Sequence, residues 1–298
     1  MKTLRVLIKR NIKLFFKDKG MFFTSLITPV ILLVLYATFL GNVYRDSFLM
    51  SIPAGLMLEE KIIDGYVGGQ LISSILAVSC VTVAFCSNML MVQDRANASA
   101  MDFTVSPVKS RILSLAYFFG SLFSTFIICL LAMGLCLCYV ASTGWFLSLS
   151  DVLFLLLDIL LLTLFGTALS SVIHFFLSTQ GQISAVGSIV SSTYGFICGA
   201  YMPISQFSEG LQTVISFLPG TYGTSLVRNH AMRGVFLEME RAGLSNETLE
   251  ILKDTIDCNL YFFDRKVPLG VMYAVLVGTV VLFLGIYILL NYLRAKKK

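Results

Sequence analysis

The stretch Q-D-R-A-N-A-S-A-M-D-F-T-V-S-P-V-K-S-R, residues 93–111, is a short charged segment between two long apolar runs. Its five charged side chains are Asp94, Arg95, Asp102, Lys109 and Arg111. Each flanking run exceeds the roughly 20 residues that a helix needs to cross a bilayer. The stretch is therefore where a membrane protein of this kind can contact a soluble partner.

The composition of the whole chain indicates a membrane protein. Hydrophobic residues make up 57% of the 298 residues and charged residues only 13%, against about 25% charged in soluble domains. No Asp, Glu, Lys or Arg occurs in residues 20–44, 65–93, 112–150, 159–208 and 267–293. We therefore predict an all-α polytopic membrane protein, a single domain over 1–298, with six transmembrane helices at 22–40, 67–92, 111–140, 151–177, 183–200 and 268–290.

The placement of basic residues predicts the orientation. Seven Lys or Arg residues precede the first span and four follow the last, whereas residues 45–64 between the first two spans contain only Arg45 and Lys61. By the positive-inside rule, both termini and residues 93–111 are cytoplasmic, in a multi-pass protein of the cell membrane. Because the excess charge flanks the spans, the net charge of +5 does not indicate nucleic-acid binding.

Residues 1–20 predict a basic amphipathic helix that lies on lipids in the cytoplasmic interface. The apolar positions recur with helical spacing, at Leu4, Leu7, Ile8, Ile12, Phe15 and Phe16. A positively charged flank that only orients the first span is the alternative. The apolar run that follows is too long for a secretory signal peptide, so an uncleaved first span is expected.

Residues 93–107 predict a short cytoplasmic helix. Asp94 is expected to cap it, and Ser106-Pro107 to end it near residue 104, because the residue before proline is driven out of the α region. The same Ser106 and Pro107 suit the N-cap and first position of the next helix. The pair would therefore fix the angle between the cytoplasmic helix and the third span.

The region between spans five and six is predicted to lie on the outer side. Residues 201–227 are apolar but interrupted, which favours two outer half-helices too short to span. Tyr201, Pro203, Pro219 and Gly220 are expected to shape an outer gate, and ordinary loop punctuation is the alternative. Residues 228–267 are predicted to form a polar outer cap, with helical spacing in 246–255 and a thiol, Cys258, in a loop.

Catalytic signatures are missing from the sequence. It contains no Gly-Lys dipeptide and therefore no Walker-type phosphate loop, and it has neither H-E-x-x-H nor G-x-S-x-G. We expect no enzyme activity, no cofactor and no metal site in this chain. Energy for uphill transport would have to come from another protein.

Three segments carry a resemblance to a known family: M-D-F-T-V-S-P-V-K at 101–109, G-F-I-C-G-A-Y-M-P-I at 195–204 and F-L-P-G-T-Y at 217–222. With the basic N-terminal helix and six spans, they resemble ABC export permeases of the type-two class. The sequence departs from that pattern at Ala98 and Ser99, where many members have Gly-Thr, and at Met101, where an acidic residue is common.

The resemblance implies a permease dimer, expected to be a homodimer, with two separate ATPase subunits that bind ATP and Mg. Such coupling requires a contact that differs between two states. The residues expected to make it are Asp94, Arg95, Asp102, Phe103, Val105, Ser106 and Pro107. A solvated loop that only sets topology is the alternative.

Asp158 is an acidic residue about 10 Å along the helix from Asp151. Intramembrane acids usually face a bundle interior or an aqueous cavity, so a place in the transport pathway is one interpretation. A carboxylate hydrogen-bonded between helices is the other. His174, near the cytoplasmic end of the same span, is expected to be interfacial rather than a proton switch.

The predicted function is outward transport of an amphipathic compound: a drug, an antibiotic, or a lipid-like or glycan-linked molecule. An ion- or proton-coupled carrier is the first alternative, for which paired charges in mid-membrane would be expected. A membrane-embedded lipid-modifying enzyme is the second, and the acids of this chain are too dispersed to favour it.

Overall fold

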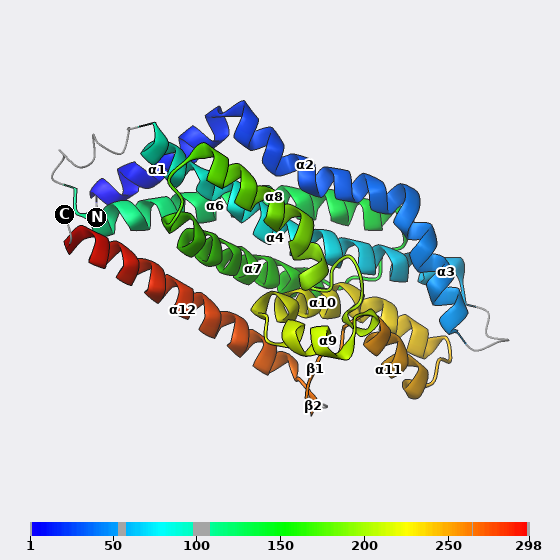
Figure 1. Ribbon diagram of the computed structural model, residues 1–298. Coiled ribbons are helices and arrows are strands. Elements are labelled where there is room, and N and C mark those ends of the chain that lie inside the picture. Colours follow the sequence, from blue (N-terminus) through cyan, green and yellow to red (C-terminus); the bar gives the residue numbers. More distant parts are fainter. Residues whose placement is uncertain (1, 53–57, 98–107, 264, 297–298) are drawn as a thin grey trace.

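The protein is a bundle of long helices with a smaller group of short elements at one end (Figure 1). The computed structural model describes residues 2–52, 58–97, 108–263 and 265–296. The elements are α1 (Lys2–Lys17), α2 (Lys19–Leu35), a π-helical turn (Tyr36–Leu40), α3 (Gly41–Ser51), α4 (Glu60–Ala96), α6 (Ser110–Thr143), α7 (Leu149–Phe175), α8 (Gln180–Ile197), a 3-10 turn (Ile204–Gln206), α9 (Glu209–Ser216), α10 (Pro219–Arg241), α11 (Asn246–Thr255), the antiparallel strands β1 (Tyr261–Phe262) and β2 (Arg265–Lys266), and α12 (Leu269–Lys296).

Helix α4 is the centre of the bundle. It has 37 residues, most of them buried, and it packs against α2, α6, α7, α8 and α10. Glycine allows the closest approach: a Cβ on Gly166 of α7 would lie 2.9 Å from the carbonyl oxygen of Cys80 in α4. Small residues at such contacts bring helix backbones together, which is how membrane helices gain packing energy.

Five helical segments are long and apolar enough to cross a membrane: Lys19–Ser51, Glu60–Ala96, Ser110–Thr143, Leu149–Phe175 and Leu269–Arg294. The prediction of an all-α polytopic membrane protein is confirmed at this level. Helix α8 occupies the place of the predicted fifth span, 183–200. It has only 18 residues and begins Gln180-Gly-Gln182, so its apolar stretch is shorter than that of the other five.

Several predicted boundaries were wrong. The first long helix does not end at residue 40, because Gly41 stays helical and the chain continues through the π-helical turn into α3. Helix α4 begins at Glu60, where Ile62, Ile63 and Tyr66 are buried against the short elements. It also continues to Ala96, so Asp94 lies in its last turn and does not cap a new helix.

The division of the outer region at residue 227 was also wrong. Helix α10 runs without a break from Pro219 to Arg241, across the expected boundary between half-helix and cap. The sequence interpretation took the charge of Arg228 as the start of a solvated segment, but its side chain is buried. The first half-helix is the 3-10 turn and the eight-residue α9, while α11 coincides with the predicted helical spacing at 246–255.

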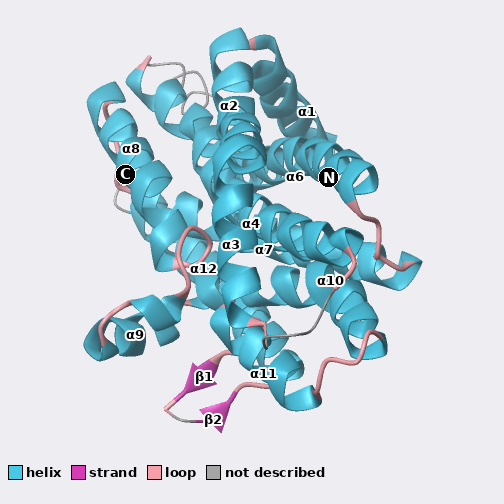
Figure 2. Cartoon of the chain, turned by 90° about the vertical axis from the view of Figure 1, so that its right-hand side faces the viewer, coloured by secondary structure: helices cyan, strands magenta, loops and turns pink. Residues whose placement is uncertain are grey.

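The two ends of the bundle are formed by different elements. Both chain termini and α1, which packs on α6, lie at one end, and α3, α11 and the β1–β2 hairpin lie at the other (Figures 1 and 2). Cys258, expected in an open loop, is buried at this second end, and burial raises the pKa of its thiol to about 12. The second end has its own apolar core, formed by α3, the start of α4, α10 and α11.

Candidate functional site

A partly buried ion pair and a tyrosine hydrogen bond hold α4 to two other helices at the end that carries the termini. The Asp94 carboxylate accepts hydrogen bonds from Arg10 Nη1 at 2.7 Å, from Arg10 Nη2 at 3.2 Å and from the Tyr117 hydroxyl at 2.6 Å. These partners belong to α1 and α6. The Asp94 carboxylate thus joins three helices, α4, α1 and α6, through charge-assisted hydrogen bonds.

Arg95 joins the same end of α4 to α7. Its Nη1 donates to the carbonyl oxygens of His174 at 3.2 Å, Phe175 at 3.0 Å and Leu177 at 3.4 Å, where α7 ends. A cation at a helix C-terminus satisfies carbonyl groups that have no partner within the helix. His174, in the last turn of α7, is buried, with Nδ1 2.8 Å from the carbonyl oxygen of Ser170.

The predicted coupling residues thus divide into two groups. Asp94 and Arg95 are described, and both make contacts within the chain. The other five, Asp102, Phe103, Val105, Ser106 and Pro107, lie outside the described residues. The contacts of the first two have a mechanical consequence: a displacement of α4 at its last turn would act on α1, α6 and α7 together.

Asp158 is the buried centre of a polar cluster. Its side chain has no exposed surface; Oδ2 lies 2.6 Å from His230 Nδ1 and Oδ1 accepts a 2.6 Å hydrogen bond from the Tyr273 hydroxyl. The cluster joins α7, α10 and α12. This geometry favours the second interpretation of Asp158, a carboxylate bonded between helices. His230 is 72 residues from Asp158 in the sequence, so no local sequence pattern predicts that the two residues pair.

Arg228 forms a second buried polar cluster, which the sequence interpretation missed. Its side chain is 2% exposed; Nη2 donates to the Gly199 carbonyl at 2.9 Å and to Ser74 Oγ at 3.3 Å, and Nη1 donates to the Ile256 carbonyl. Asp257 Oδ2 lies 3.5 Å from Nη1. Burial raises the pKa of Asp257 to about 6, while Arg228 and a hydrogen bond from the Ile204 N–H act in the opposite direction.

Two of the four predicted outer-gate residues, Tyr201 and Gly220, pack at the end of α8. The ring of Tyr201 lies against Gly195 and edge-on to Phe196, at 5.2 Å between ring centres. Gly220, in the first turn of α10, lies against the neighbouring Tyr194, where a Cβ would be 2.6 Å from the hydroxyl oxygen. Pro219 is the first residue of α10, and Pro203 precedes the 3-10 turn. Residues from both sides of α9 therefore pack on consecutive residues of α8.

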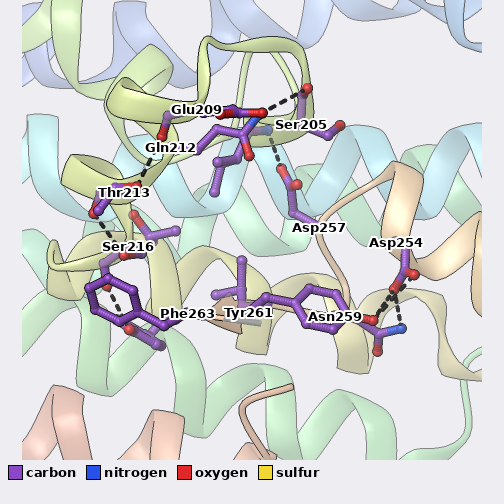
Figure 3. A pocket seen from close by; sticks show the side chains of 14 residues that line it. Ser205, Glu209, Gln212, Thr213, Ser216, Asp254, Asp257, Asn259, Tyr261 and Phe263 are labelled. Carbon is purple, nitrogen blue, oxygen red and sulfur yellow. Dashed lines mark hydrogen bonds between the residues drawn. The ribbon is translucent and has the colours of Figure 1, made fainter. Parts of the chain in front are cut away.

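A cleft of 630 Å³ lies beside this junction, between the 3-10 turn, α9 and the loop after α11 (Figure 3). Its polar groups are largely engaged with one another. Gln212 donates to the carbonyl oxygens of Ser205 and Phe207, and Asp254 accepts from Asn259 at 2.7 Å. Across the described residues, no group of three or more His, Cys, Asp or Glu side chains could hold a metal ion.

The comparisons with known proteins bear directly on these helices. The family described as ABC-2 type transporter matches residues 2–231, which include α1 to α9 and most of α10. The comparison with curated proteins gives no match. Membrane chains of the matched family normally pair with an ABC ATPase subunit. The match covers more than half of the sequence and confirms the resemblance, so the chain belongs to the ABC-2 type transporter family and is a transmembrane permease subunit of an ABC transporter.

Proposed function

We propose that this chain is the permease of an ATP-driven exporter, in which two copies and two ATPase subunits move an amphipathic compound outward. In this arrangement both termini are cytoplasmic, α8 is a sixth span, and residues 93–107 contact the ATPase. ATP and Mg are bound by the partner subunit alone. The membrane is the cell membrane.

The observation that carries the proposal is the exposed face of α8. This helix packs mainly on α4, and its exposed surface presents Ser184, Ser188 and Ser191 on one side, next to Ile189, which is 63% exposed and shares its side with Thr193. A hydroxyl group that faces hydrocarbon finds no hydrogen-bond partner in the lipid. Polar positions at membrane depth therefore usually face other helices or an aqueous path. A mixed hydroxyl and apolar face suits a path for amphipathic compounds between two copies of the chain.

Helix α2 supports the same arrangement. It packs on the side of α4 and exposes apolar side chains along its length, including Phe23 at 59% and Ile31 at 51%. Small and apolar helix faces associate in membranes through close packing. In the proposed dimer, α2 and α8 of the two copies face one another, and the ties of Asp94 and Arg95 pass movement from the ATPase to the rest of the bundle.

Cysteine cross-linking tests the α8 face. In a chain whose seven natural cysteines are replaced by alanine, Ser188→Cys is expected to cross-link two copies in membranes, and the transported compound should reduce the yield. The control is Val281→Cys on α12, 66% exposed, which should not cross-link. Equal cross-linking at the two positions would contradict the proposed dimer.

Labelling and transport assays test orientation and coupling. Glu247→Cys on α11, in the same cysteine-free chain, should react with a membrane-impermeant maleimide added outside cells. With the ATPase subunit co-expressed, substitution of Asp102, Phe103 or Pro107 should abolish transport while expression is retained. Full transport in these variants would contradict the coupling role of the segment.

The buried pair of Asp158 and His230 is an observation that favours a second candidate, a proton-coupled carrier. Paired titratable groups within the membrane are typical of proton relays. The two candidates differ in energy source. Transport by the exporter should stop when the ATPase is inactivated and continue when a protonophore collapses the proton gradient, and the carrier should show the reverse.

A further inference from the structure

A second cleft, of 620 Å³, lies between α7, α10, α11 and the start of α12. Helix α10 turns one face toward it, with His230, Arg233 and Leu237 at successive turns. In the described part of the chain, neither α2 nor α8 contributes a lining residue. The cleft is therefore a separate feature from the proposed transport face.

His230 provides a buried donor at the inner end of this cleft. Its side chain is 9% exposed and stacks on Phe154 at 4.9 Å between ring centres. The buried Asp158 carboxylate lies 2.6 Å from Nδ1 and fixes the orientation of the ring. Nδ1 is bonded to Asp158 and Nε2 has no hydrogen-bond partner among the described residues, so Nε2 is left for a ligand and donates an N–H to an anion when the ring is protonated.

Arg233 adds a second donor one turn further along α10. Its side chain is 52% exposed, and Nη1 lies 3.2 Å from Asp151 Oδ1. The guanidinium fork has further N–H groups that can bind an anion in addition to Asp151. Asp151 does not depend on Arg233 for its position, because it also accepts hydrogen bonds from the backbone and hydroxyl of Ser148 at the start of α7.

The rest of the cleft is an apolar wall that reaches the surface of the bundle. Phe154, Leu237 and Leu269 line it and are 42%, 45% and 40% exposed. Phe154 and Leu269 belong to α7 and α12, two of the membrane-spanning candidates. An apolar chain could therefore enter the cleft from the side, from the layer occupied by lipids.

The acidic residues that line the cleft are Glu240 and Glu250, whereas the carboxylates paired with the two donors, Asp158 and Asp151, are 0% and 2% exposed and do not line it. Glu240 is about 15 Å from His230 and about 10 Å from Arg233 along the axis of α10. Glu250 is bound by Lys253 at 2.8 Å and by Lys266 at 2.6 Å, so its charge is compensated. The cleft thus has the imidazole of His230 and the guanidinium of Arg233 at one end and apolar surface beside them.

We propose that this cleft binds an amphiphilic anion, with a carboxylate or phosphate head on His230 and Arg233 and an apolar chain along Phe154, Leu237 and Leu269. A free amphiphile and a lipid with an anionic headgroup share this chemistry. The proposal goes beyond the transport function and does not require it, because binding is measured on the permease alone, without ATPase.

The test is equilibrium binding of radiolabelled dodecanoate to the full-length chain in phosphatidylcholine nanodiscs. Saturable binding is expected, with Kd raised about tenfold or more in Arg233→Gln, the effect of losing a charge-assisted hydrogen bond. Leu237→Glu, which places a carboxylate on an exposed part of the wall, should weaken binding similarly. The matched control is Arg241→Gln on the same helix, whose side chain is 73% exposed and lies outside the cleft; it should bind like the unmodified chain.

Competition experiments identify the chemistry and the source of the ligand. Dodecylamine, with the same chain and the opposite charge, should not displace dodecanoate. If phosphatidylglycerol in the nanodisc lowers dodecanoate binding in the unmodified chain but not in Arg233→Gln, the site accepts a lipid headgroup; if it has no effect, the site accepts a free amphiphile only. Equal Kd values for Arg233→Gln and Arg241→Gln, or displacement by dodecylamine, would overturn the proposal.

Discussion

Replacing Arg228 by methionine is expected to destabilise the junction between α10, α4 and the loop after α11. Methionine keeps part of the volume but donates no hydrogen bond, so the carbonyl oxygens of Ile256 and Gly199 lose their donor. Each buried polar group without a partner costs about 1–3 kcal/mol, and removing one partner of a buried ion pair costs about 3–5 kcal/mol. Because these losses overlap, we expect the free energy of unfolding to fall by about 5 kcal/mol.

The pH dependence of this loss follows from Asp257. Its pKa in the folded protein is about 6, above the unfolded value of about 3.9, so its contribution to stability is fully present below about pH 4 and is lost as the pH rises through 6. Arg228 opposes the rise in the pKa of Asp257, so the variant should have a higher pKa still. In the variant, the contribution of Asp257 to stability therefore continues to fall above pH 6. The free energy of unfolding of the variant should lie further below that of the unmodified chain at pH 8 than at pH 5.

Thermal unfolding of the purified protein in detergent measures both effects. The unfolding temperature of Arg228→Met should fall well below that of the unmodified chain, and the difference should widen from pH 5 to pH 8. The double variant Arg228→Met, Asp257→Asn should remove the pH dependence and recover part of the stability. If Arg228→Met unfolds like the exposed variant Arg241→Gln, or if its deficit is the same at pH 5 and pH 8, the assigned role of the buried pair is wrong.

Three further predictions test other contacts. Asp158→Asn should lower stability by about 1–3 kcal/mol in thermal unfolding, because the amide cannot accept from both His230 and Tyr273; a changed substrate preference without loss of stability would instead favour the pathway interpretation. Gly166→Leu should separate α7 from α4 and cost about 1–3 kcal/mol, whereas Gly278→Leu, which has open space around it, should unfold normally. Hydrogen bonds from Lys253 and Lys266 lower the pKa of Glu250 to about 2. Its partly exposed carboxylate should therefore add at most about 1 kcal/mol to the free energy of unfolding above pH 4, and this contribution should be lost as the pH falls toward 2. Glu250→Gln should flatten the pH profile of unfolding.

The parts of the fold that depend on local sequence could be predicted. The membrane segments follow from runs of apolar residues, and α11 follows from helical spacing at 246–255, because both signals are contained within the element itself. The boundaries were less predictable. Gly41 and Arg228 look like interruptions in the sequence, but neighbouring helices hold both in regular structure, and packing of this kind overrides local propensity.

The polar clusters could not be predicted, because their partners are distant in sequence. Asp94 and Arg10 are 84 residues apart, and Asp158 and Tyr273 are 115 apart. An acidic residue within a membrane helix indicates that a partner exists, but it does not say which of the remaining polar residues that partner is. Arg228 carried no signal at all, because a single arginine in a polar stretch normally lies at the surface.

Helix α4 connects the two ends of the molecule through these clusters. Its 37 residues form a rod of about 55 Å. Asp94 and Arg95 tie one end to α1, α6 and α7, and Ser74, further toward the other end, contacts Arg228 of α10. The elements bound to α4 by buried polar contacts should move with it as one body.

Helices α2 and α8 meet α4 without a buried ion pair among the described residues, so relative movement in a transport cycle should be concentrated at their contacts with α4. Distance measurements between spin labels on α8 and α7, with and without ATP in the assembled transporter, should change, whereas distances between α6 and α7 should not.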